Sequence, residues 1–156
     1  MKKLLLVIAM VAIGLTAHAQ DGTFNVGANI GLPSADADTA YDFAFSLEAN
    51  YLFEVSDEFK VGPSLSYAHY FGDINDASFL PIDAAARFDA SEKIVIGLNL
   101  GYAVGLSPNG NDGGFHYRPS VGYNIAENTT IQASYSGVSV EGGTFANIGL
   151  GVVFGL

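Results

Sequence analysis

The chain has 156 residues, of which 49% are hydrophobic and 14% are charged, and its formal net charge is −10. With six Lys and Arg residues in total, it lacks the clustered cations of a nucleic-acid-binding surface. The absence of Cys excludes disulfide frameworks, thiolate zinc sites and cysteine nucleophiles. A chain this apolar, with 19 Gly and 11 Phe, is unusual for a soluble domain. The order of apolar and polar residues along the chain indicates the reason.

Residues 1–19 have the layout of a secretory signal peptide. Lys2 and Lys3 precede an apolar run that ends at Leu15, and Ala17-His18-Ala19 then forms an A-x-A cleavage site. The run is shorter than the roughly 20 residues of a spanning helix. We therefore expect export through the periplasm with removal of residues 1–19, which leaves residues 20–156 as one domain. Loss of the two lysines leaves four basic residues against 16 acidic ones, a net charge of −12.

The rest of the chain alternates between apolar residues and small or polar residues with a period of two, which is typical of β-strands. The alternation covers eight segments: residues 24–32, 41–53, 59–71, 80–89, 94–106, 115–125, 131–136 and 147–156. Connectors after the first, third, fifth and seventh segments are longer than the others. This pattern, with segments near the ~9–11 residues that cross a bilayer, predicts an antiparallel up-and-down barrel with two different rims.

The apolar face of these segments is predicted to point outward, into lipid. It carries most of the Phe and Tyr residues and no Asp, Glu, Lys or Arg, whereas the opposite face is mainly Gly, Ala, Ser and Asn. The interior of an eight-stranded barrel is only wide enough for side chains to fill, so the aromatic face would overfill it. We therefore predict an all-β, eight-stranded transmembrane β-barrel. The competing class is a soluble secreted barrel that binds a small apolar ligand.

Aromatic residues gather near both ends of the predicted strands, as expected for the two membrane interfaces. The upper rim is predicted to carry Tyr41, Phe43, Phe71, Phe79, Phe115, Tyr117 and Phe145, and the lower rim Phe24, Tyr51, Phe53, Phe59, Phe88, Tyr123 and Phe154. Pro63 and Pro119 fall inside segments although proline cannot donate to a ladder, so we expect a bulge at each.

This pattern resembles the small outer-membrane β-barrel family, the OmpA/OmpX-type eight-stranded proteins, over Phe24 to Leu156. The final Gly151-Val152-Val153-Phe154-Gly155-Leu156 is similar to the family's C-terminal insertion signal, with Leu156 in place of the usual Phe. The resemblance implies a bacterial outer-membrane location, contacts with outer-membrane lipids and lipopolysaccharide, and recognition of the C-terminal strand by the barrel-assembly machinery. We expect a monomer without the peptidoglycan-binding domain of some relatives.

The inward face carries a set of charged residues that we predict to form a salt-bridge network filling the lumen: Asp42, Glu48, Lys60, Asp83, Arg87, Asp89 and Arg118, with His116 nearby. Charges in a space with little water must pair, because their desolvation is costly. Lys60 with Asp89, and Glu48 or Asp83 with Arg87, are plausible partners. A structural or surface-interaction role follows from a filled lumen. The alternative is a narrow porin-like channel for small solutes, lined by the same residues.

Enzymatic function is not expected. His69 lies on the outward face near the upper rim, where a lipid-modifying enzyme would place a histidine, but its outward neighbours on the strand are Tyr67 and Phe71 and Ser66 points inward. No Ser-His-acid arrangement is visible. A lipid-modifying enzyme stays open as a third class, to be tested by His69→Ala.

Six acidic residues lie in the longer connectors: Asp36, Asp38, Asp73, Asp76, Asp112 and Glu141. None of these connectors has the spacing of a defined calcium loop, so we predict solvated acidic loops, with cation bridging to lipopolysaccharide phosphates as the alternative. We predict no metal site and no cofactor.

Overall fold

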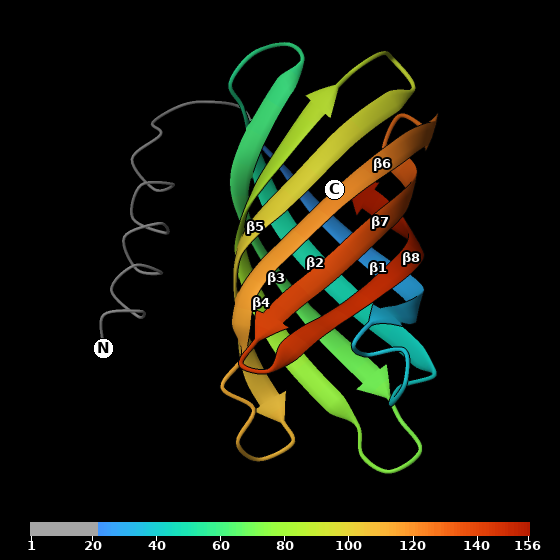
Figure 1. Cartoon of the computed structure of the whole chain (residues 1–156). Helices are drawn as coiled ribbons and strands as arrows, with labels where there is room; N and C mark the ends of the chain where they lie inside the picture. Colours follow the sequence, from blue (N-terminus) through green and yellow to red (C-terminus); the bar gives the residue numbers. More distant parts are fainter. Residues whose placement is uncertain (1–21) are drawn as a thin grey trace, which may run out of the picture.

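The computed structural model describes residues 22–156, which form one closed barrel of eight antiparallel strands (Figure 1). The strands are β1 (Gly22–Ala35), β2 (Phe43–Glu54), β3 (Phe59–Phe71), β4 (Ala77–Asp89), β5 (Ile94–Ser107), β6 (Gly114–Ala126), β7 (Thr129–Val140) and β8 (Gly143–Gly155). The predicted signal peptide lies outside the described residues. Within those residues no helix is long and apolar enough to cross a membrane.

Each strand pairs with its neighbour in the chain, and β8 returns to pair with β1. This closing ladder runs from Asn25 opposite Gly155 to Ala35 opposite Phe145, and the Leu156 amide extends it by donating to the Phe24 carbonyl over 2.9 Å. The barrel therefore has no free strand edge. In lipid this matters because the hydrocarbon offers no water to an unpaired amide or carbonyl.

The connectors divide the barrel into two ends. One end, which we call the short-turn end, carries the turns 55–58, 90–93 and 127–128, which are at the top of Figure 1. Gly22 and Leu156 belong to the same end of the barrel. Residues 36–42, 72–76, 108–113 and 141–142 lie at the long-loop end. The last of these was expected to be long but is a tight turn, in which Val140 pairs with Gly143 and Gly142 has a φ of 93°.

The eight predicted strands and the direction of their apolar face are confirmed. Outward aliphatic side chains at mid-strand are open to the surroundings, with exposed fractions of 50% for Leu47, 49% for Leu65 and 62% for Leu150. Aromatic side chains near the strand ends are also exposed, among them Phe24, Phe59 and Phe88 at the short-turn end and Phe43, Phe71 and Phe115 at the long-loop end. An outer surface of this kind suits hydrocarbon between two interfaces.

Three aromatic residues assigned to the outward upper rim lie elsewhere. Phe79 is fully buried, and Phe145 and Tyr41 pack against it or its neighbours inside the barrel. For Phe79 and Phe145 the reason is that β4 and β8 extend beyond the segments predicted from alternation, to Ala77 and Gly143, whereas Tyr41 precedes β2 and lies in the loop 36–42. Phe79 and Phe145 thereby share the inward parity of Asp83 and Asn147 on their own strands.

The bulges expected at Pro63 and Pro119 are absent from the described ladders. Pro63 pairs with Ala84, and Pro119 pairs with Leu98, without a shift of register. On the other side of Pro63 the register of β2 against β3 is also the same before and after it. Both proline side chains are exposed on the outer surface.

Leu65→Arg tests the outward face, because this side chain lies at the middle of β3. A cation placed there should cost about 2–4 kcal/mol of unfolding free energy in vesicles, the range for a lipid-facing site at the midplane. Urea titration of the barrel in phosphatidylcholine vesicles measures the cost. The matched control is Ser56→Arg in an exposed turn, which should change the free energy by less than about 0.5 kcal/mol. Equal effects of the two variants would contradict the assignment.

Candidate functional site

A cluster of four polar side chains lies in the middle of the lumen, and we call it the central ion cluster. It consists of Asn29 on β1, Glu48 on β2, Arg118 on β6 and Gln132 on β7, with exposed fractions of 4–6%. Arg118 binds the carboxylate in bidentate fashion, with Nη1 donating to Glu48 Oε2 over 2.8 Å and Nη2 to Oε1 over 3.1 Å. Such paired, charge-assisted bonds are strong and orient both groups.

The amides complete this cluster. Gln132 Nε2 donates to Glu48 Oε1 over 2.7 Å and to Asn29 Oδ1 over 3.0 Å, while Arg118 Nη2 also reaches Asn29 Oδ1 over 3.0 Å. The four side chains therefore link strands from both sides of the β1–β8 seam across the barrel. Gly151 on β8 provides room, because a Cβ at this position would collide with the Asn29 amide.

A second buried pair lies beside this cluster. His116 Nδ1 is 2.9 Å from both carboxylate oxygens of Asp83, and its Nε2 is 3.1 Å from Ser136 Oγ. A carboxylate only accepts, so Nδ1 carries the hydrogen in this contact. The sequence pointed to Arg87 as the partner of Asp83 or Glu48, and the structure corrects this: His116 and Arg118 occupy the two acids.

The Lys60–Asp89 pair expected from the sequence is present, with Lys60 Nζ 3.0 Å from Asp89 Oδ2. It lies toward the short-turn end and is about a quarter exposed on each side chain. Arg87 instead donates through Nη1 to Asn99 Oδ1 and to its neighbour's carbonyl, Ala86 O, each over 2.8 Å. Asp42 is not part of the network: it is exposed and precedes β2, where its amide donates to the Phe71 carbonyl.

A group of packed rings lies inside the barrel at the long-loop end, and we call it the aromatic cap. It is formed by Tyr70 and Phe79, which are 1% and 0% exposed, together with Tyr41 and Phe145. The ring centroids of Phe79 and Phe145 are 5.0 Å apart, and those of Tyr70 and Phe145 are 5.8 Å apart, both in edge-on contact. Asn147 Nδ2 donates to the Tyr70 hydroxyl over 2.8 Å. Burial and the nearby Asp76 raise the pKa of Tyr41.

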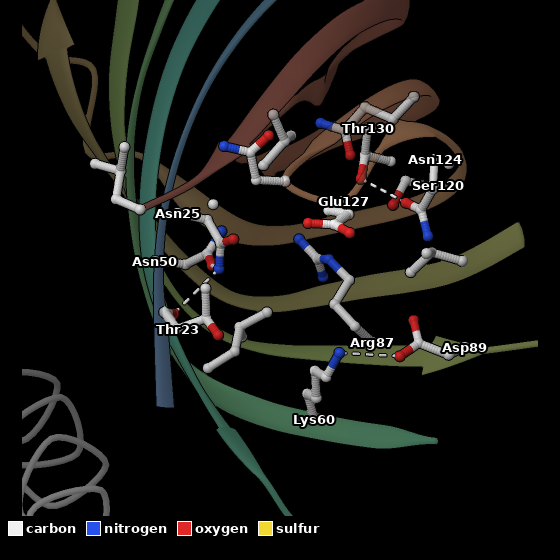
Figure 2. Close-up of a pocket in the computed structure, with 18 residues that line it drawn as sticks. Thr23, Asn25, Asn50, Lys60, Arg87, Asp89, Ser120, Asn124, Glu127 and Thr130 are labelled. Carbon is white, nitrogen blue, oxygen red and sulfur yellow. Dashed lines mark hydrogen bonds and ion pairs between the residues drawn. The ribbon is translucent and has the colours of Figure 1, made fainter. Parts of the chain in front are cut away.

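The short-turn end is open, and its lumen forms a cavity of about 510 Å³ (Figure 2). Eight of its 18 lining residues carry an amide or a hydroxyl, among them Asn25, Asn50, Ser120, Asn124 and Thr130. Gln132 of the central ion cluster also lines it, so the cavity reaches to the middle of the barrel. The lumen therefore has three layers: the aromatic cap, the buried ion pairs and a polar cavity.

His69 on the outer surface has partners that the sequence did not reveal. Its Nε2 is 3.3 Å from Asp76 Oδ2, and its Nδ1 is 3.0 Å from the Tyr67 hydroxyl. Because the carboxylate accepts from Nε2, the other nitrogen accepts from Tyr67. The acid comes from the loop before β4, so spacing along β3 could not indicate it. Within residues 22–156, no three potential ligands from His, Asp or Glu are grouped to hold a metal ion.

The neutral members of the lumen network, Asn29, Gln132 and Asn99, were also missed. Their inward parity was visible in the sequence, but an amide on an inward face gives no indication of its partner. Asn29 and Gln132 are separated by 103 positions in the chain and meet because the barrel closes.

Comparisons with known proteins agree with this architecture. A family model described as "Outer membrane protein beta-barrel domain" matches residues 4–155. Among solved structures, Ail, the attachment invasion locus protein of Yersinia pestis, is 17% identical with a TM-score of 0.62, covering 88% of this chain and 99% of that one. The N-terminal barrel of Pseudomonas aeruginosa OprF is 20% identical with a TM-score of 0.54, covering 87% and 100%.

The outer membrane enzyme PagL has the same fold, with 14% identity, a TM-score of 0.54 and coverage of 83% of this chain and 98% of that one. No curated protein matches the chain at a significant level. At these identities the solved structures establish the fold alone.

Glu48→Ala tests the central ion cluster. The change leaves Arg118 buried without its carboxylate, which should lower the free energy of unfolding by about 3–5 kcal/mol in a urea titration. Lys60→Ala is the control, because its pair with Asp89 is partly exposed and should contribute less than about 1 kcal/mol. The double variant Glu48→Met/Arg118→Met should recover much of the loss. A Glu48→Ala cost as small as that of Lys60→Ala would contradict the assigned role.

Proposed function

The chain belongs to the outer membrane protein β-barrel family, and from this premise we propose that it acts as a closed, structural or surface-interaction barrel rather than as a channel. In such barrels the short turns face the periplasm and the longer loops face the exterior. The cavity then opens toward the periplasm, and the aromatic cap lies at the outer surface. The observation that carries the proposal is the central ion cluster, which spans the lumen between these two layers.

A permeating solute would have to displace both closed layers. Moving past Glu48 and Arg118 would break a bidentate ion pair that is 4–5% exposed, and an uncompensated charge there is costly. Tyr70 and Phe79 then block the outer end with closely packed rings. The interior of an eight-stranded barrel is narrow enough for side chains to fill, whereas larger barrels leave water-filled channels. The narrow porin-like alternative is supported only by the periplasmic cavity.

Recording in planar bilayers tests the closed lumen. The purified barrel, inserted at single-molecule density in 1 M salt (a concentration at which charge steering is screened), should show no steady conductance steps. The matched variant Glu48→Ala/Arg118→Ala/Phe79→Ala removes both obstructing layers and should conduct if it folds. Steady, uniform steps from the unmodified protein would contradict the proposal and favour the narrow channel.

The outward surface supports an interaction role with outer-membrane lipids and lipopolysaccharide. The two groups of exposed aromatic side chains lie where lipid headgroups meet hydrocarbon. The outer loops are acidic and internally braced: Asp36 accepts from the Thr144 amide over 2.8 Å, and Asp76 accepts from the Gly72 amide over 3.2 Å. Asp38, Asp73 and Asp112 stay exposed and present negative charge to the exterior. We further propose that the protein is a monomer, because no strand edge is left for another chain.

The C-terminal strand supports recognition by the barrel-assembly machinery. Phe154 and Leu156 point outward and are 42% and 76% exposed, which leaves both side chains accessible on the strand that closes the barrel. Gly151 has a second role here, since it accommodates Asn29 of the central ion cluster. A soluble barrel that binds an apolar ligand is poorly supported, because the inward walls of the cavity are mainly polar and the aliphatic face is exposed.

We propose that the His69 group is structural rather than catalytic. It places Tyr67, not serine, against the histidine, and an acyl-tyrosine is a poor product of attack on an alkyl ester because phenoxide leaves more readily than alkoxide. The contact between His69 and Asp76 instead ties the loop 72–76 to the outer face of β3.

Mass spectrometry of lipid A tests this assignment. Overexpression in an outer membrane should leave the number and length of lipid A acyl chains unchanged, and His69→Ala should have no effect on the same spectrum. An altered acyl pattern that disappears with His69→Ala and persists with the neighbouring Phe71→Ala would show that the barrel is a lipid-modifying enzyme.

A further inference from the structure

Arg87 is a charged side chain of the lumen that takes part in none of the ion pairs among the described residues. Among the residues that the structure describes, Lys60 is paired with Asp89, Arg118 with Glu48 and His116 with Asp83. No described carboxylate lies within 4.0 Å of the Arg87 guanidinium. Its hydrogen-bond partners are the neutral oxygens of Asn99 and Ala86, both bound by Nη1. Nη2 and Nε are therefore available to another acceptor.

The position of Arg87 increases its need for a counter-ion. Lys60 lies directly opposite it in the β3–β4 ladder, and like charges at facing positions destabilise a sheet. Lys60 is neutralised by Asp89, whereas the nearest acids on the other side, Glu48 and Asp83, are already held by Arg118 and His116. A partly buried cation in this situation gains from any anion that can reach it.

The cavity gives such an anion access. Arg87 lines the cavity, and Figure 2 shows its guanidinium extending across the cavity toward the Glu127 side chain. A volume of about 510 Å³ lies in the range of small-molecule sites and is large enough for an anion that keeps part of its hydration. Because the cavity opens at the short-turn end, the anion would enter from the periplasm.

A second donor converges on the same space. Across the β4–β5–β6 ladders Arg87 faces Gly97, and Gly97 faces Ser120. A Cβ at Gly97 would collide with Ser120 Oγ and would lie 3.2 Å from Arg87 Nε, so the missing side chain lets both groups lie close together over this position, and both line the cavity. A guanidinium beside a hydroxyl suits a planar carboxylate or a phosphate, which guanidinium binds through two parallel hydrogen bonds.

We propose that the periplasmic cavity is a binding site for a small soluble carboxylate or phosphate anion, held by Arg87 with Ser120 as a second donor. Glu127 is exposed at the mouth of the cavity and repels such a ligand, which limits its affinity. The amides of Asn50 and Asn124 in the walls are available to polar groups that the anion carries. This site does not depend on the closed lumen, because the cavity is open at its periplasmic end.

NMR titration tests the site on the refolded barrel in octyl glucoside, a detergent without phosphate or charge. Sodium phosphate and sodium acetate are added separately at constant ionic strength. Saturable shifts are expected for the Arg87 Nε–H signal and the Gly97 and Ser120 amides, with a dissociation constant on the order of millimolar. The stronger of the two responses identifies the preferred chemistry, phosphate or carboxylate.

Arg87→Gln should weaken this binding by more than about tenfold, since it removes the charged donor. Lys60→Gln/Asp89→Asn is the matched control: it removes the neighbouring ion pair without freeing the Asp89 carboxylate and should keep the response. Heat-modifiable gel mobility establishes folding, and if Arg87→Gln fails to fold, Arg87→Lys should fold and bind more weakly than the unmodified protein. The proposal is overturned if neither anion gives a saturable shift at these groups, or if the shifts survive unchanged in the folded Arg87 variant.

Discussion

In the hydrocarbon of a bilayer an unpaired backbone amide has no water to bind, so the hydrogen bonds between β1 and β8 are the contacts on which the rest of this barrel depends. They join strands at opposite ends of the sequence and remove the last free edge. Once the sheet is closed, the period of two in the sequence becomes a division between an outer and an inner surface. The outer positions must match lipid, and the inner positions must fill a space of fixed width.

The side chains that fill the inner space are of different kinds at different positions along the barrel axis. At the long-loop end large rings fill the space, with Phe79 and Tyr70 almost fully buried. In the middle Glu48 and Arg118 fill it with a charged pair whose remaining bonding capacity is taken by Asn29 and Gln132. At the short-turn end a cavity remains, lined by amides, hydroxyls and the charged side chains of Lys60, Arg87 and Asp89. The filling of the lumen therefore differs along the barrel axis, and Arg87 lies in the part where a cavity remains.

The barrel was predictable from the sequence because apolar residues alternate with a period of two, so each inward or outward assignment needs only the neighbouring residues. The errors arose at strand ends and for partners that lie on distant strands. Phe79 and Phe145 already had inward parity, but alternation faded near the loops, so the extensions of β4 to Ala77 and of β8 to Gly143 were not recognised. The partner of Arg118 could not be predicted either. Glu48 lies 70 positions away, and only the relative stagger of strands around the closed barrel brings the two together. Lys60 and Asp89 were predictable because they lie on adjacent strands.

The most direct test of this account is whether the outward methyl groups contact lipid and the inward ones do not. In a nanodisc, NMR cross-relaxation from lipid acyl chains should reach the methyl groups of Leu65, Leu100 and Leu150, which are exposed at mid-strand. It should not reach those of Ala85, Ala103 and Val138, which are at most 2% exposed. Acyl-chain contacts to the inward set, with water contacts to the outward set, would show that the barrel is turned inside out and would contradict the account.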